Sequence, residues 1–300
     1  MFKIAVMSLG NIALKAYMPL YIANQDLVEF HFYTRNQEKL AQLQAQYQLG
    51  HCYSDLEALE NVDLDAVMIH SPTHVHAEMI DWAFDRNLHV FVDKPISDDF
   101  TEVKRLLKRA EKQNLVLFTG FNRRYAPINK KLKAVTDKNL ILAEKHREQT
   151  KQDAKFALFD MMIHMVDTAL YLLDAPIIDA HLTVKTAPDQ SLKQAIIQLE
   201  TESTTALSMI NMYAGARPET VKVMSPTAGI YEVVDLDNLI INQGHEKIQQ
   251  AFPDWTDVLV RRGFSDMFKD FLAKVKANQA INNELTKASH YWVDKLYQKI

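Results

Sequence analysis

A short apolar stretch near the middle of the chain carries three titratable side chains at helical spacing. Asp160, His164 and Asp167 are four and three residues apart, so one face of a helix would carry all three. Polar groups on an apolar helix cost stability unless they are hydrogen-bonded. If these three side chains face a cavity, His164 can transfer a proton there, with support from Asp160. A structural interpretation stays open: Asp160 serves the helix start, His164 is a satisfied core histidine, and Asp167 is the partner of an arginine.

A second candidate is a lysine at the end of a predicted strand. The apolar run Leu88–Val92 is followed by Asp93, Lys94 and Pro95. Ligands of open α/β sheets bind at the carboxyl ends of the strands, and the following proline keeps the backbone of Lys94 extended. From that place Lys94 can polarise a substrate oxygen, although a surface lysine after a strand would give the same pattern.

The start of the chain carries a turn that is typical of dinucleotide binding. Between the apolar strand Phe2–Met7 and a helix, Ser8, Gly10 and Ala13 occupy the three positions of the pattern G-x-G-x-x-G/A. Gly10 leaves room for a pyrophosphate, and the N–H groups of the helix start would receive the anion, which adds Asn11 and Ile12 to the site. Ser8 indicates a turn without positive φ at that position, or a slightly strained one. A plain helix start is the alternative.

The end of the second predicted strand bears on the choice between NAD and NADP. An acidic residue there binds the ribose 2′-hydroxyl of NAD, but the segment Tyr33–Asn36 contains no carboxylate. Thr34 can donate a hydrogen bond, and the planar fork of Arg35 matches phosphate oxygens. We therefore expect NADP(H) to be preferred over NAD(H), unless Arg35 only covers the helix that follows.

A histidine-rich run follows the third predicted strand. It contains His70, Ser71, His74 and His76. Contact with nicotinamide or substrate is the predicted role of this run, with loop solvation as the alternative. No metal site is predicted, because no Cys or Glu lies at ligand spacing from these histidines.

Another polar run, residues 120–125, follows the last strand of the first half. Asn122, Arg123 and Tyr125 are candidates to line a substrate cleft. The arginines of this run are equally compatible with a structural role.

The first 120 residues alternate between buried strands and helices, which predicts a doubly wound parallel sheet covered on both faces. The predicted strands are Phe2–Met7, Val28–Tyr33, Asp65–His70, Leu88–Val92 and Leu115–Thr119. The predicted helices are Asn11–Ala23, Gln37–Tyr47, His76–Arg86 and Thr101–Gln113. This organisation sets residues 1–120 apart as a Rossmann NAD(P)-binding domain.

After Gly120 the rhythm changes to successive strands with few helices between them, so residues 121–300 are expected to form an α+β domain with a large, mostly antiparallel sheet. The predicted helices are Ile128–Val135, Asp160–Leu173, Gly263–Asn278 and Asn283–Gln298. The predicted strands are Leu140–Glu148, Ala180–Ala187, Ala195–Glu200, Thr205–Met212, Glu219–Met224, Ile230–Val234 and Leu239–Ile241.

Composition excludes several classes of protein. Hydrophobic residues make up 48% and charged residues 24% of the chain, which is the balance of a globular protein and not of a disordered one. The net charge of −4 gives no general attraction to nucleic acid or anionic lipid. One cysteine, Cys52, cannot form an internal disulfide, and no targeting segment or membrane span is recognised, so a cytoplasmic location is expected.

Five motifs, taken in order, resemble the Gfo/Idh/MocA family, which includes glucose–fructose oxidoreductase and inositol dehydrogenase. They are SLGNIALKAYMP, HSPTHVHAEMI, HVFVDKPIS, TGFNRRYAP and DMMIHMVDTALYLLD. The chain looks most similar to MviM-type members, which share the V-D-K-P and G-F-N-R-R-[FY]-A-P segments and a K-H-R, here Lys145–Arg147.

The resemblance implies an NAD(P) cofactor, hydride transfer at a carbon of a sugar or cyclic polyol, and a homodimer or homotetramer formed through the C-terminal sheet. It implies that Lys94 contacts substrate and nicotinamide, that His164 is the acid/base with Asp160 beside it, and that Asn122 and Arg123 lie near the substrate. Three positions depart from the family pattern: Ser8 replaces glycine, Asp93 replaces glutamate, and Met162 stands where many members have glycine.

The sequence thus predicts an NADP(H)-dependent oxidoreductase. The predicted catalytic residues are Lys94, His164 and Asp160, and the predicted substrate contacts are Lys94, Asn122, Arg123, Tyr125 and His164. The predicted cofactor contacts are Ser8, Gly10, Asn11, Ile12, Thr34, Arg35, Ser71, His74, His76, Asp93 and Lys94. Two alternative functions remain open: a nucleotide-binding sensor without turnover, and a protein-interaction scaffold built on the open sheet.

Overall fold

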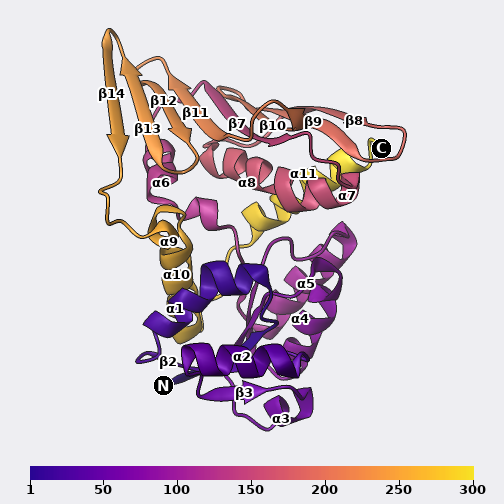
Figure 1. The fold of residues 1–300 in the computed structure, drawn as a ribbon. Coiled ribbons are helices and arrows are strands. Elements are labelled where there is room, and N and C mark those ends of the chain that lie inside the picture. The colour runs from indigo at the N-terminus through magenta and orange to yellow at the C-terminus, as the bar shows by residue number, and fades with distance from the viewer. The chain divides into compact units, whose positions relative to one another are not determined.

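Six parallel strands form the sheet of the first of two units. The computed structural model describes residues 1–300, which divide into unit 1 (Met1–Gly120 and Met267–Asn283) and unit 2 (Phe121–Asp266 and Glu284–Ile300). The sheet of unit 1 has the order β3-β2-β1-β4-β5-β6, and its strands β2 and β3 are labelled in Figure 1. Its strands are β1 (Phe2–Met7), β2 (Val28–Tyr33), β3 (His51–Tyr53), β4 (Ala66–Ile69), β5 (His89–Val92) and β6 (Leu117–Thr119).

Helices cover both faces of this sheet, which explains why its central strands are apolar throughout. One face, with Ala5, Val67 and Val90, packs against α4 (His76–Asp85) and α5 (Phe100–Gln113). On the other face the ring of Phe30 lies 4.8 Å from that of Tyr21 in α1 (Met18–Ala23). The remaining helices of the unit are α2 (Gln37–Tyr47) and α3 (Leu56–Glu60), whose first turns are capped by the side chains of Asn36 and Asp55.

The first helix of unit 1 is irregular. It is helical from Asn11 to Ala23, but residues Ala13–Tyr17 form a π-helical turn in which the N–H of Met18 donates to the carbonyl of Ala13. Pro19 lacks an N–H, so the regular ladder is interrupted at this point. Such π-helical turns often lie at functional sites.

The helix α10 (Phe264–Lys276) differs from the expected organisation, because most of it belongs to unit 1 although residues 121–300 were expected to form the second domain. Phe268 packs 6.1 Å from Tyr21, and Phe271 packs 5.5 Å from Phe91, measured between ring centroids. These aromatic contacts bury α10 on the face of the parallel sheet opposite α4 and α5. Hydrophobic periodicity predicted the helix but not the partner of its apolar face.

Eight strands form the sheet of unit 2, in the order β14-β13-β12-β11-β7-β10-β9-β8. All neighbouring pairs are antiparallel except β7 with β10, which run parallel. The strands are β7 (Leu140–Glu148), β8 (Asp179–Thr186), β9 (Leu192–Glu200), β10 (Thr205–Ala214), β11 (Glu219–Ser225), β12 (Gly229–Val234), β13 (Asn238–Gln243) and β14 (Glu246–Ala251).

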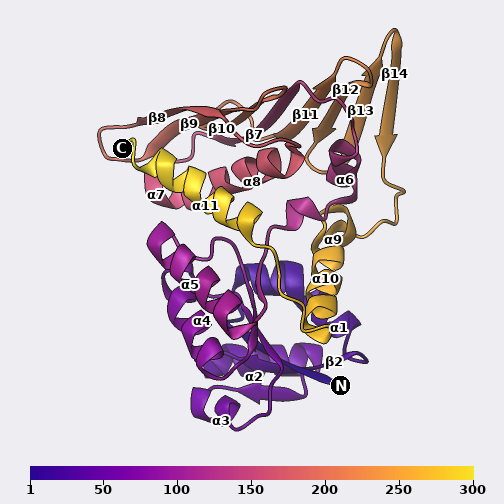
Figure 2. The same cartoon turned by 180° about the vertical axis from the view of Figure 1, so that it is seen from behind.

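The helices of unit 2 lie on one face of its sheet, as Figures 1 and 2 show from opposite sides. They include α6 (Pro127–Lys133), α7 (Ala154–Ala157), α8 (Ile163–Leu172) and α11 (Glu284–Tyr297), while α9 (Val258–Arg261) precedes α10. Strand residues alternate accordingly: Ile141 and Ala143 are fully buried against the helices, and Leu142 between them is half-buried on the other face. The predicted fold class, a parallel Rossmann sheet plus a mostly antiparallel open sheet, is confirmed.

Two strands and several short helical segments were missed, among them α3 and α9. β3 has three residues, and β14 consists of exposed residues without an apolar pattern, so neither carries the period that identifies a strand. The predicted helix Asp160–Leu173 is a π-helical turn, Leu158–Met162, followed by α8, with α7 before it. None of the helices combines the length and the hydropathy that a membrane-spanning segment needs.

Candidate functional site

The carboxyl ends of four strands in unit 1 are aligned, which gathers the loops that follow them at one edge of the sheet. The last residues of β1, β4, β5 and β6 pair in a row: Met7, Ile69, Val92 and Thr119. Open α/β sheets bind their ligands at this edge. The predicted turn, the histidine-rich run and Lys94 all follow these strand ends.

The turn after β1 has the features of a phosphate-binding loop. Ser8 has a φ of 73°, so the backbone of this turn is in the left-handed region at a residue other than glycine. Of the two alternatives for Ser8, a turn without positive φ is wrong, and a slightly strained turn is confirmed. A Cβ placed on Gly10 would meet only the carbonyl oxygen of His70, at 3.8 Å, which is ordinary contact. The fold itself does not require glycine here, whereas a ligand pressed against the backbone would. Asn11 and Ile12, which begin the helix, are exposed.

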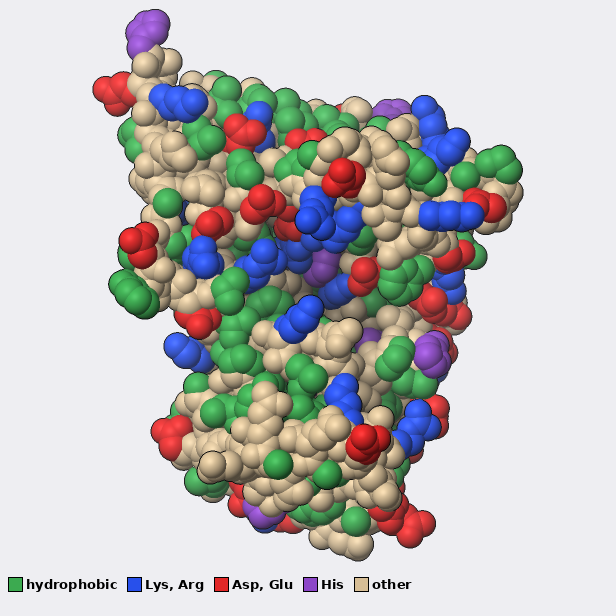
Figure 3. All heavy atoms as spheres, in the orientation of Figure 1, with side chains coloured by type: hydrophobic (Ala, Val, Ile, Leu, Met, Phe, Trp, Pro, Cys, Tyr) green, Lys and Arg blue, Asp and Glu red, His purple; other side chains and the backbone are tan.

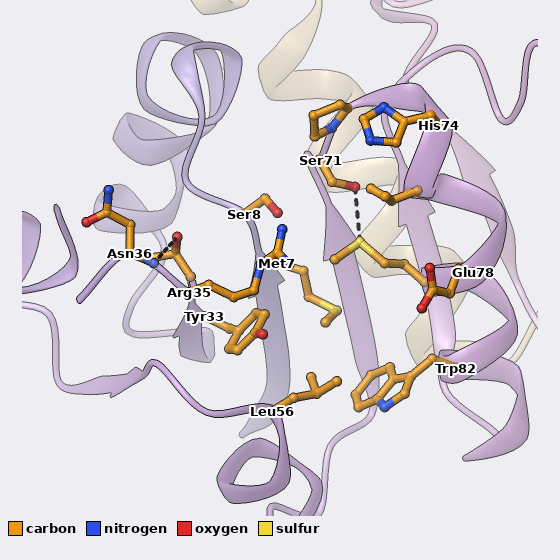
Figure 4. Close-up of a pocket in the computed structure, with 14 residues that line it drawn as sticks. Met7, Ser8, Tyr33, Arg35, Asn36, Leu56, Ser71, His74, Glu78 and Trp82 are labelled. Atoms are coloured by element: carbon orange, nitrogen blue, oxygen red, sulfur yellow. Dashed lines mark hydrogen bonds between the residues drawn. The ribbon is translucent and has the colours of Figure 1, made fainter. Parts of the chain in front are cut away.

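Beside this turn lies a cavity of about 690 Å³ between the ends of β1, β2 and β4 (Figure 4). Five residues predicted to contact the cofactor line it: Ser8, Thr34, Arg35, Ser71 and His74. Apolar side chains form much of its remaining wall and include Leu56, Val75, Met79 and Trp82. A cavity with apolar walls and a few polar groups at its rim can hold a purine ring and its ribose.

The polar side of this cavity is the loop after β2. Arg35 is exposed at its own position, and its side chain extends into the cavity in Figure 4. The Thr34 hydroxyl accepts a bond from the Asn36 N–H at 3.4 Å. The amide oxygen of Asn36 accepts from the Lys39 N–H and so caps α2. One guanidinium, one hydroxyl and no carboxylate in this loop suit a phosphate group better than a ribose diol.

His76 is placed differently from the prediction that it contacts the cofactor. Its side chain is buried, and its two ring nitrogens lie 2.8 Å from the carbonyl oxygens of Pro95 and Ser71. Burial lowers the pKa of His76, while the two backbone bonds oppose that effect. Because both nitrogens are used by the backbone, His76 ties the loop after β4 to the loop after β5 and does not line the cavity.

Asp93 is likewise turned inward. Its two oxygens bond to the Tyr17 hydroxyl at 2.7 Å and to Nδ1 of His70 at 2.8 Å. Burial alone would raise the pKa of Asp93, but the charge and hydrogen bond of His70 and the Tyr17 bond outweigh it and lower the pKa. The predicted direct contact between Asp93 and a cofactor is therefore replaced by a role in holding the strand ends together.

Lys94 follows this anchored aspartate. It is half-buried, and the peptide bond to Pro95 is cis. The carbonyl of Pro95 is the acceptor for His76. The backbone on both sides of Lys94 is thus tied to buried side chains, which is the support that a precisely placed amine needs. Lys94 belongs to unit 1, whereas Asp160 and His164 belong to unit 2.

In unit 2, His164 lies on the first turn of α8, directly after the π-helical turn that contains Asp160. Its Nδ1 is 2.8 Å from Nη1 of Arg123, a residue of the 3₁₀ turn Asn122–Arg124. His164 and Asp160 are both half-buried. The polar residues Asp160 and His164 lie on an apolar helical segment, as predicted. Arg123, which the spacing of residues along this segment did not indicate, contacts His164 as well.

Arg123 is held by a carboxylate on the neighbouring sheet. Nε and Nη2 of Arg123 donate to the two oxygens of Glu219 in β11, at 2.6 and 2.7 Å. Lys145 of β7 donates to the same carboxylate at 2.5 Å. Burial, followed by the charge of Arg123, lowers the pKa of Lys145 to about 8. Burial would raise the pKa of Glu219, but the charges of Arg123 and Lys145 hold it well below its ordinary value.

Asp167, the last of the three polar residues predicted on this helix, has a structural role as the partner of an arginine. Its carboxylate pairs with the guanidinium of Arg124 and accepts a bond from the Ser289 hydroxyl at 2.7 Å. Asp167 is 1% exposed. The sequence-based alternative, that Asp167 is the partner of an arginine, is confirmed, and this pair joins the 3₁₀ turn to α8 and α11.

Asn122 is also occupied within unit 2. Its amide nitrogen donates to the carbonyl of Arg262 at 2.8 Å, and its amide oxygen accepts from Arg123 at 3.3 Å. With 5% of its surface exposed, Asn122 supports the turn and offers little to a substrate. Tyr125, the next predicted substrate contact, is half-buried at the end of the same turn.

Several residues of these two sites were not found from the sequence. Trp82 and Met79 of α4 line the cavity because they face the loop after β2, and an apolar helix residue carries no sign of such a contact. Glu219 carried a weak signal, since it is a charged residue at the start of an alternating strand and is only 9% exposed.

A group of possible metal ligands lies elsewhere, on β2 and β3. Glu29, His31 and His51 lie close together, with Nε2 of His31 2.8 Å from Glu29 Oε1. The rings of His31 and His51 are stacked, with centroids 4.6 Å apart and planes at 20°. Stacked rings point their nitrogen lone pairs along nearly parallel planes, so they do not converge on one ion. Hydrogen bonding between Glu29 and His31 explains the group without a metal.

Comparison with known proteins agrees with this geometry. Residues 2–121 match the family model described as "Oxidoreductase family, NAD-binding Rossmann fold", and residues 123–244 match "YceM-like, C-terminal domain". A Salmonella typhimurium protein described as "Putative oxidoreductase YceM" is 27% identical over 284 residues, which cover 93% of this chain and 91% of that protein. The myo-inositol 2-dehydrogenase of Thermotoga maritima is 29% identical over 149 residues, 46% of this chain and 45% of that protein.

Among the solved structures that match the whole chain are two with at least 25% sequence identity. A Gfo/Idh/MocA family oxidoreductase from Vibrio cholerae has a TM-score of 0.92 at 28% identity, covering 100% of this chain and 98% of that one. A dehydrogenase (MviM) from Clostridium difficile has a TM-score of 0.92 at 25% identity, covering 100% and 99%. With its NAD-binding Rossmann unit and YceM-like second unit, the chain belongs to the Gfo/Idh/MocA oxidoreductase family.

Proposed function

We propose that the protein is an NADP(H)-dependent dehydrogenase that acts on a carbinol or carbonyl carbon of a small polar substrate, a sugar or cyclic polyol. The observation that carries this proposal is the cavity of about 690 Å³ at the carboxyl ends of β1, β2 and β4, with Ser8 and Arg35 in its wall. Inositol dehydrogenase activity in the Thermotoga maritima relative supports the substrate class. Bound NADP(H) would supply the hydride donor or acceptor.

Different residues of unit 1 bind different parts of the cofactor. The backbone of Gly10, Asn11 and Ile12 binds the pyrophosphate, because helix N–H groups without internal partners point at it. Thr34 and Arg35 bind the ribose 2′-phosphate. Ser71 and His74 close the opposite wall.

Lys94, His164 and Asp160 form the catalytic set at the reacting oxygen. The Lys94 ammonium polarises this oxygen, since a positive charge favours the form that carries developing negative charge. His164 hydrogen-bonds the oxygen, and Asp160, four residues earlier on the same helical segment, orients the imidazole. Tyr125 contacts the substrate beside them.

The experiment that tests this function combines binding and turnover. Fluorescence titration should give a lower dissociation constant for NADPH than for NADH. Sugars and inositols with NADP⁺, and ketoses with NADPH, should reveal turnover, and Lys94→Met should abolish it while NADPH binding stays nearly intact. Tighter binding of NADH overturns the cofactor preference. NADPH binding without turnover of any substrate favours a sensor instead, and undiminished turnover in Lys94→Met refutes the assignment of Lys94.

The uncovered face of the eight-stranded sheet supports an oligomer. Leu142 and Leu207 pair across β7 and β10, and Met209 pairs with Ile196 across β10 and β9, all half-buried on the face without helices. We propose that a second copy of the chain covers this apolar centre. Light scattering should give twice or four times the 34.5 kDa chain mass.

The charges on the face seen in Figure 3 are mixed. Lys and Arg side chains lie among Asp and Glu side chains there, so this face does not offer nucleic acid a uniformly positive surface.

A further inference from the structure

Strand β7 carries two positive side chains on the face of its sheet that the helices cover. Lys145 and Arg147 are two residues apart, so they lie on the same face as Ile141 and Ala143, which are buried against the helices. Both are half-buried. Residues two apart on a strand are separated by about 7 Å, which brings their long side chains within reach of one ligand group.

Arg147 differs from the other arginines that are not exposed. Each of the others forms an ion pair with an aspartate or a glutamate. They are Arg109, Arg123, Arg124 and Arg261. The guanidinium of Arg147 forms no ion pair, and its one hydrogen bond is to the carbonyl of His146 at 3.2 Å. A guanidinium has five N–H donors, so most of those of Arg147 are left for a ligand.

Lys145 lies deeper and shares its acidic partner with another cation. Its side chain is 13% exposed, and its Nζ donates to Oε2 of Glu219 at 2.5 Å. The same carboxylate accepts two bonds from Arg123. An ammonium has three N–H donors, so two of those of Lys145 have no acceptor in the chain. Burial and the charge of Arg123 lower the pKa of Lys145 to about 8, and the charge of Arg147 acts in the same direction.

The positive charge of this group is balanced only in part. Its three cations are Arg123, Lys145 and Arg147. One carboxylate, that of Glu219, forms ion pairs with two of them. Asp235 accepts a bond from the backbone N–H of Glu219 at 3.0 Å, but Asp235 is exposed and pairs with none of the three cations. An excess of positive charge therefore remains in a poorly hydrated place, and a bound anion would neutralise it.

This positive group adjoins His164. Nη1 of Arg123 lies 2.8 Å from Nδ1 of His164. Nη2 of Arg123 and Nζ of Lys145 both donate to Oε2 of Glu219. These contacts bring the Lys145 ammonium to within about 10 Å of the imidazole. A six-carbon sugar with an acidic group at one end can bridge that distance.

We propose that Lys145 and Arg147 bind an acidic group of the substrate, a carboxylate or a phosphate, so that the substrate is an acidic sugar or polyol and not a neutral one. The planar fork of Arg147 matches two oxygens of either group, and Lys145 adds a point charge. This names the substrate class of the proposed dehydrogenase and rests on that function. It also differs from the expectation that Arg123 binds the substrate, because Arg123 is held by Glu219.

Anion binding can be measured without cofactor or turnover. The full-length protein is labelled with ¹³C-lysine, and the ε-carbon signal of Lys145 is identified by its loss in Lys145→Arg. The probes are sodium phosphate and sodium acetate, each compared with sodium chloride at equal ionic strength. A bound anion should raise the midpoint of the Lys145 titration by about one pH unit, because an opposite charge favours the ammonium.

The two probes distinguish the two acidic groups. An effect of phosphate alone assigns the site to a phosphorylated substrate, and an effect of acetate assigns it to a carboxylated one. A Lys145 titration that neither anion changes overturns the proposal, whether or not the protein turns over any sugar.

Arg147→Gln removes the cation that has no acidic partner in the chain. The anion concentration that gives half of the Lys145 effect should rise about tenfold or more, and Arg147→Lys should restore part of the loss. Lys247→Gln removes one positive charge from β14, at the edge of the sheet, and is the matched control. Equal responses in Arg147→Gln and the unaltered protein contradict the role of Arg147.

Urea unfolding separates ligand binding from a structural role of Arg147. Because no carboxylate loses a partner, Arg147→Gln should unfold at the same urea concentration as the unaltered protein, or at a higher one. A clearly lower midpoint would mean that Arg147 stabilises the fold and is not reserved for a ligand.

Substrate preference tests the inference at the level of the reaction. With NADP⁺, glucose 6-phosphate and glucuronate are compared with glucose. The KM of one acidic sugar should be about tenfold or more below that of glucose, and the ratio should fall toward one in Arg147→Gln. A lower KM for glucose than for both acidic sugars overturns the substrate class. If none of the three is turned over, the proposed function fails for these sugars, and the Lys145 titration still decides whether the anion site exists.

Discussion

Nδ1 of His70 lies 2.8 Å from Oδ2 of Asp93, and this pair joins the loops that follow β4 and β5. The other oxygen of Asp93 accepts from Tyr17, a residue of the π-helical turn, at 2.7 Å. One carboxylate therefore links the helix that begins at the turn after β1 with the loop that carries Lys94. This arrangement makes the relative placement of the turn after β1 and of Lys94 depend on a single carboxylate, that of Asp93.

Asp93→Asn is expected to lower the free energy of unfolding by about 2 kcal/mol, because the charged acceptor of two partly buried bonds is replaced by a neutral one. Urea unfolding measures the loss. Asp63→Asn, an exposed aspartate just before β4, is the control and should be close to neutral. Equal midpoints for Asp93→Asn and the unaltered protein would show that the Asp93 bonds contribute nothing.

Arg35→Ala tests the cofactor preference at the residue on which it depends. A bond from a guanidinium to phosphate is worth about 1.5 to 3 kcal/mol, so the dissociation constant of NADPH should rise tenfold or more. That of NADH should change little, because NADH has no 2′-phosphate. Lys112→Ala removes an exposed positive charge elsewhere in unit 1 and serves as the control. A parallel loss of NADH and NADPH binding would remove the basis for the preference.

The strain at Ser8 gives a prediction about stability. A non-glycine residue at a φ of 73° costs about 1 to 2 kcal/mol. Ser8→Gly should therefore raise the urea midpoint, although the greater freedom of glycine in the unfolded chain reduces the gain to about 1 kcal/mol or less. Ser8→Val should lower the midpoint, since a branched side chain fits this region poorly. Ser54→Gly, at a residue without positive φ, should not stabilise; equal gains at both positions would contradict the argument.

Two aspartates with arginine or lysine partners should respond very differently to the same substitution. Asp167 is 1% exposed in its pair with Arg124, and breaking a buried pair costs about 3 to 5 kcal/mol. Asp266 pairs with Lys130 at the surface, where the side chains are 41% and 45% exposed, and such pairs contribute about 0 to 1 kcal/mol. Asp167→Asn should therefore be far more destabilising than Asp266→Asn in urea unfolding. Similar losses would mean that burial does not set the strength of these pairs.

The sequence predicted the strands and helices that carry a regular hydrophobic period, and it located the tight turn between β1 and the first helix. β1 and β2 have the predicted bounds because their apolar runs end at a turn residue. It did not predict that α10 packs against Phe30 and Phe91, since a period shows which face is apolar and not what covers it. The strand β14 was missed because all its residues are exposed.

The candidate site was predictable to the extent that it follows strand ends. Ser71 and His74 line the cavity as expected, whereas His76 turned inward because a helix starts there and points its ring at two backbone carbonyls. The partnership of Arg123 with Glu219 joins residues that are 96 positions apart, so no local spacing reveals it. Such pairs depend on the order of the strands in the sheet of unit 2. The alternation of apolar and polar residues identifies each strand by itself and does not show which strands are neighbours.

His290 gives the sharpest expectation for pH dependence. It is fully buried in α11, and its Nδ1–H donates to the carbonyl of Thr286 at 2.7 Å. Burial lowers the pKa of His290 from 6.5 to about 4. Between these two values the unfolded chain binds a proton that the folded chain does not, so the free energy of unfolding falls as the pH drops from 6.5 toward 4 and is unaffected by this group above 6.5.

The expected loss from this one group approaches roughly 3 kcal/mol, at 1.36 kcal/mol for each pH unit of the interval. His290→Gln keeps a donor for the Thr286 carbonyl and removes the titration, so its unfolding free energy should depend less steeply on pH in the same interval. His245→Gln, on the exposed turn between β13 and β14, is the matched control and should retain the full dependence. Identical pH dependence in His290→Gln and the unaltered protein would assign the acid sensitivity to other groups.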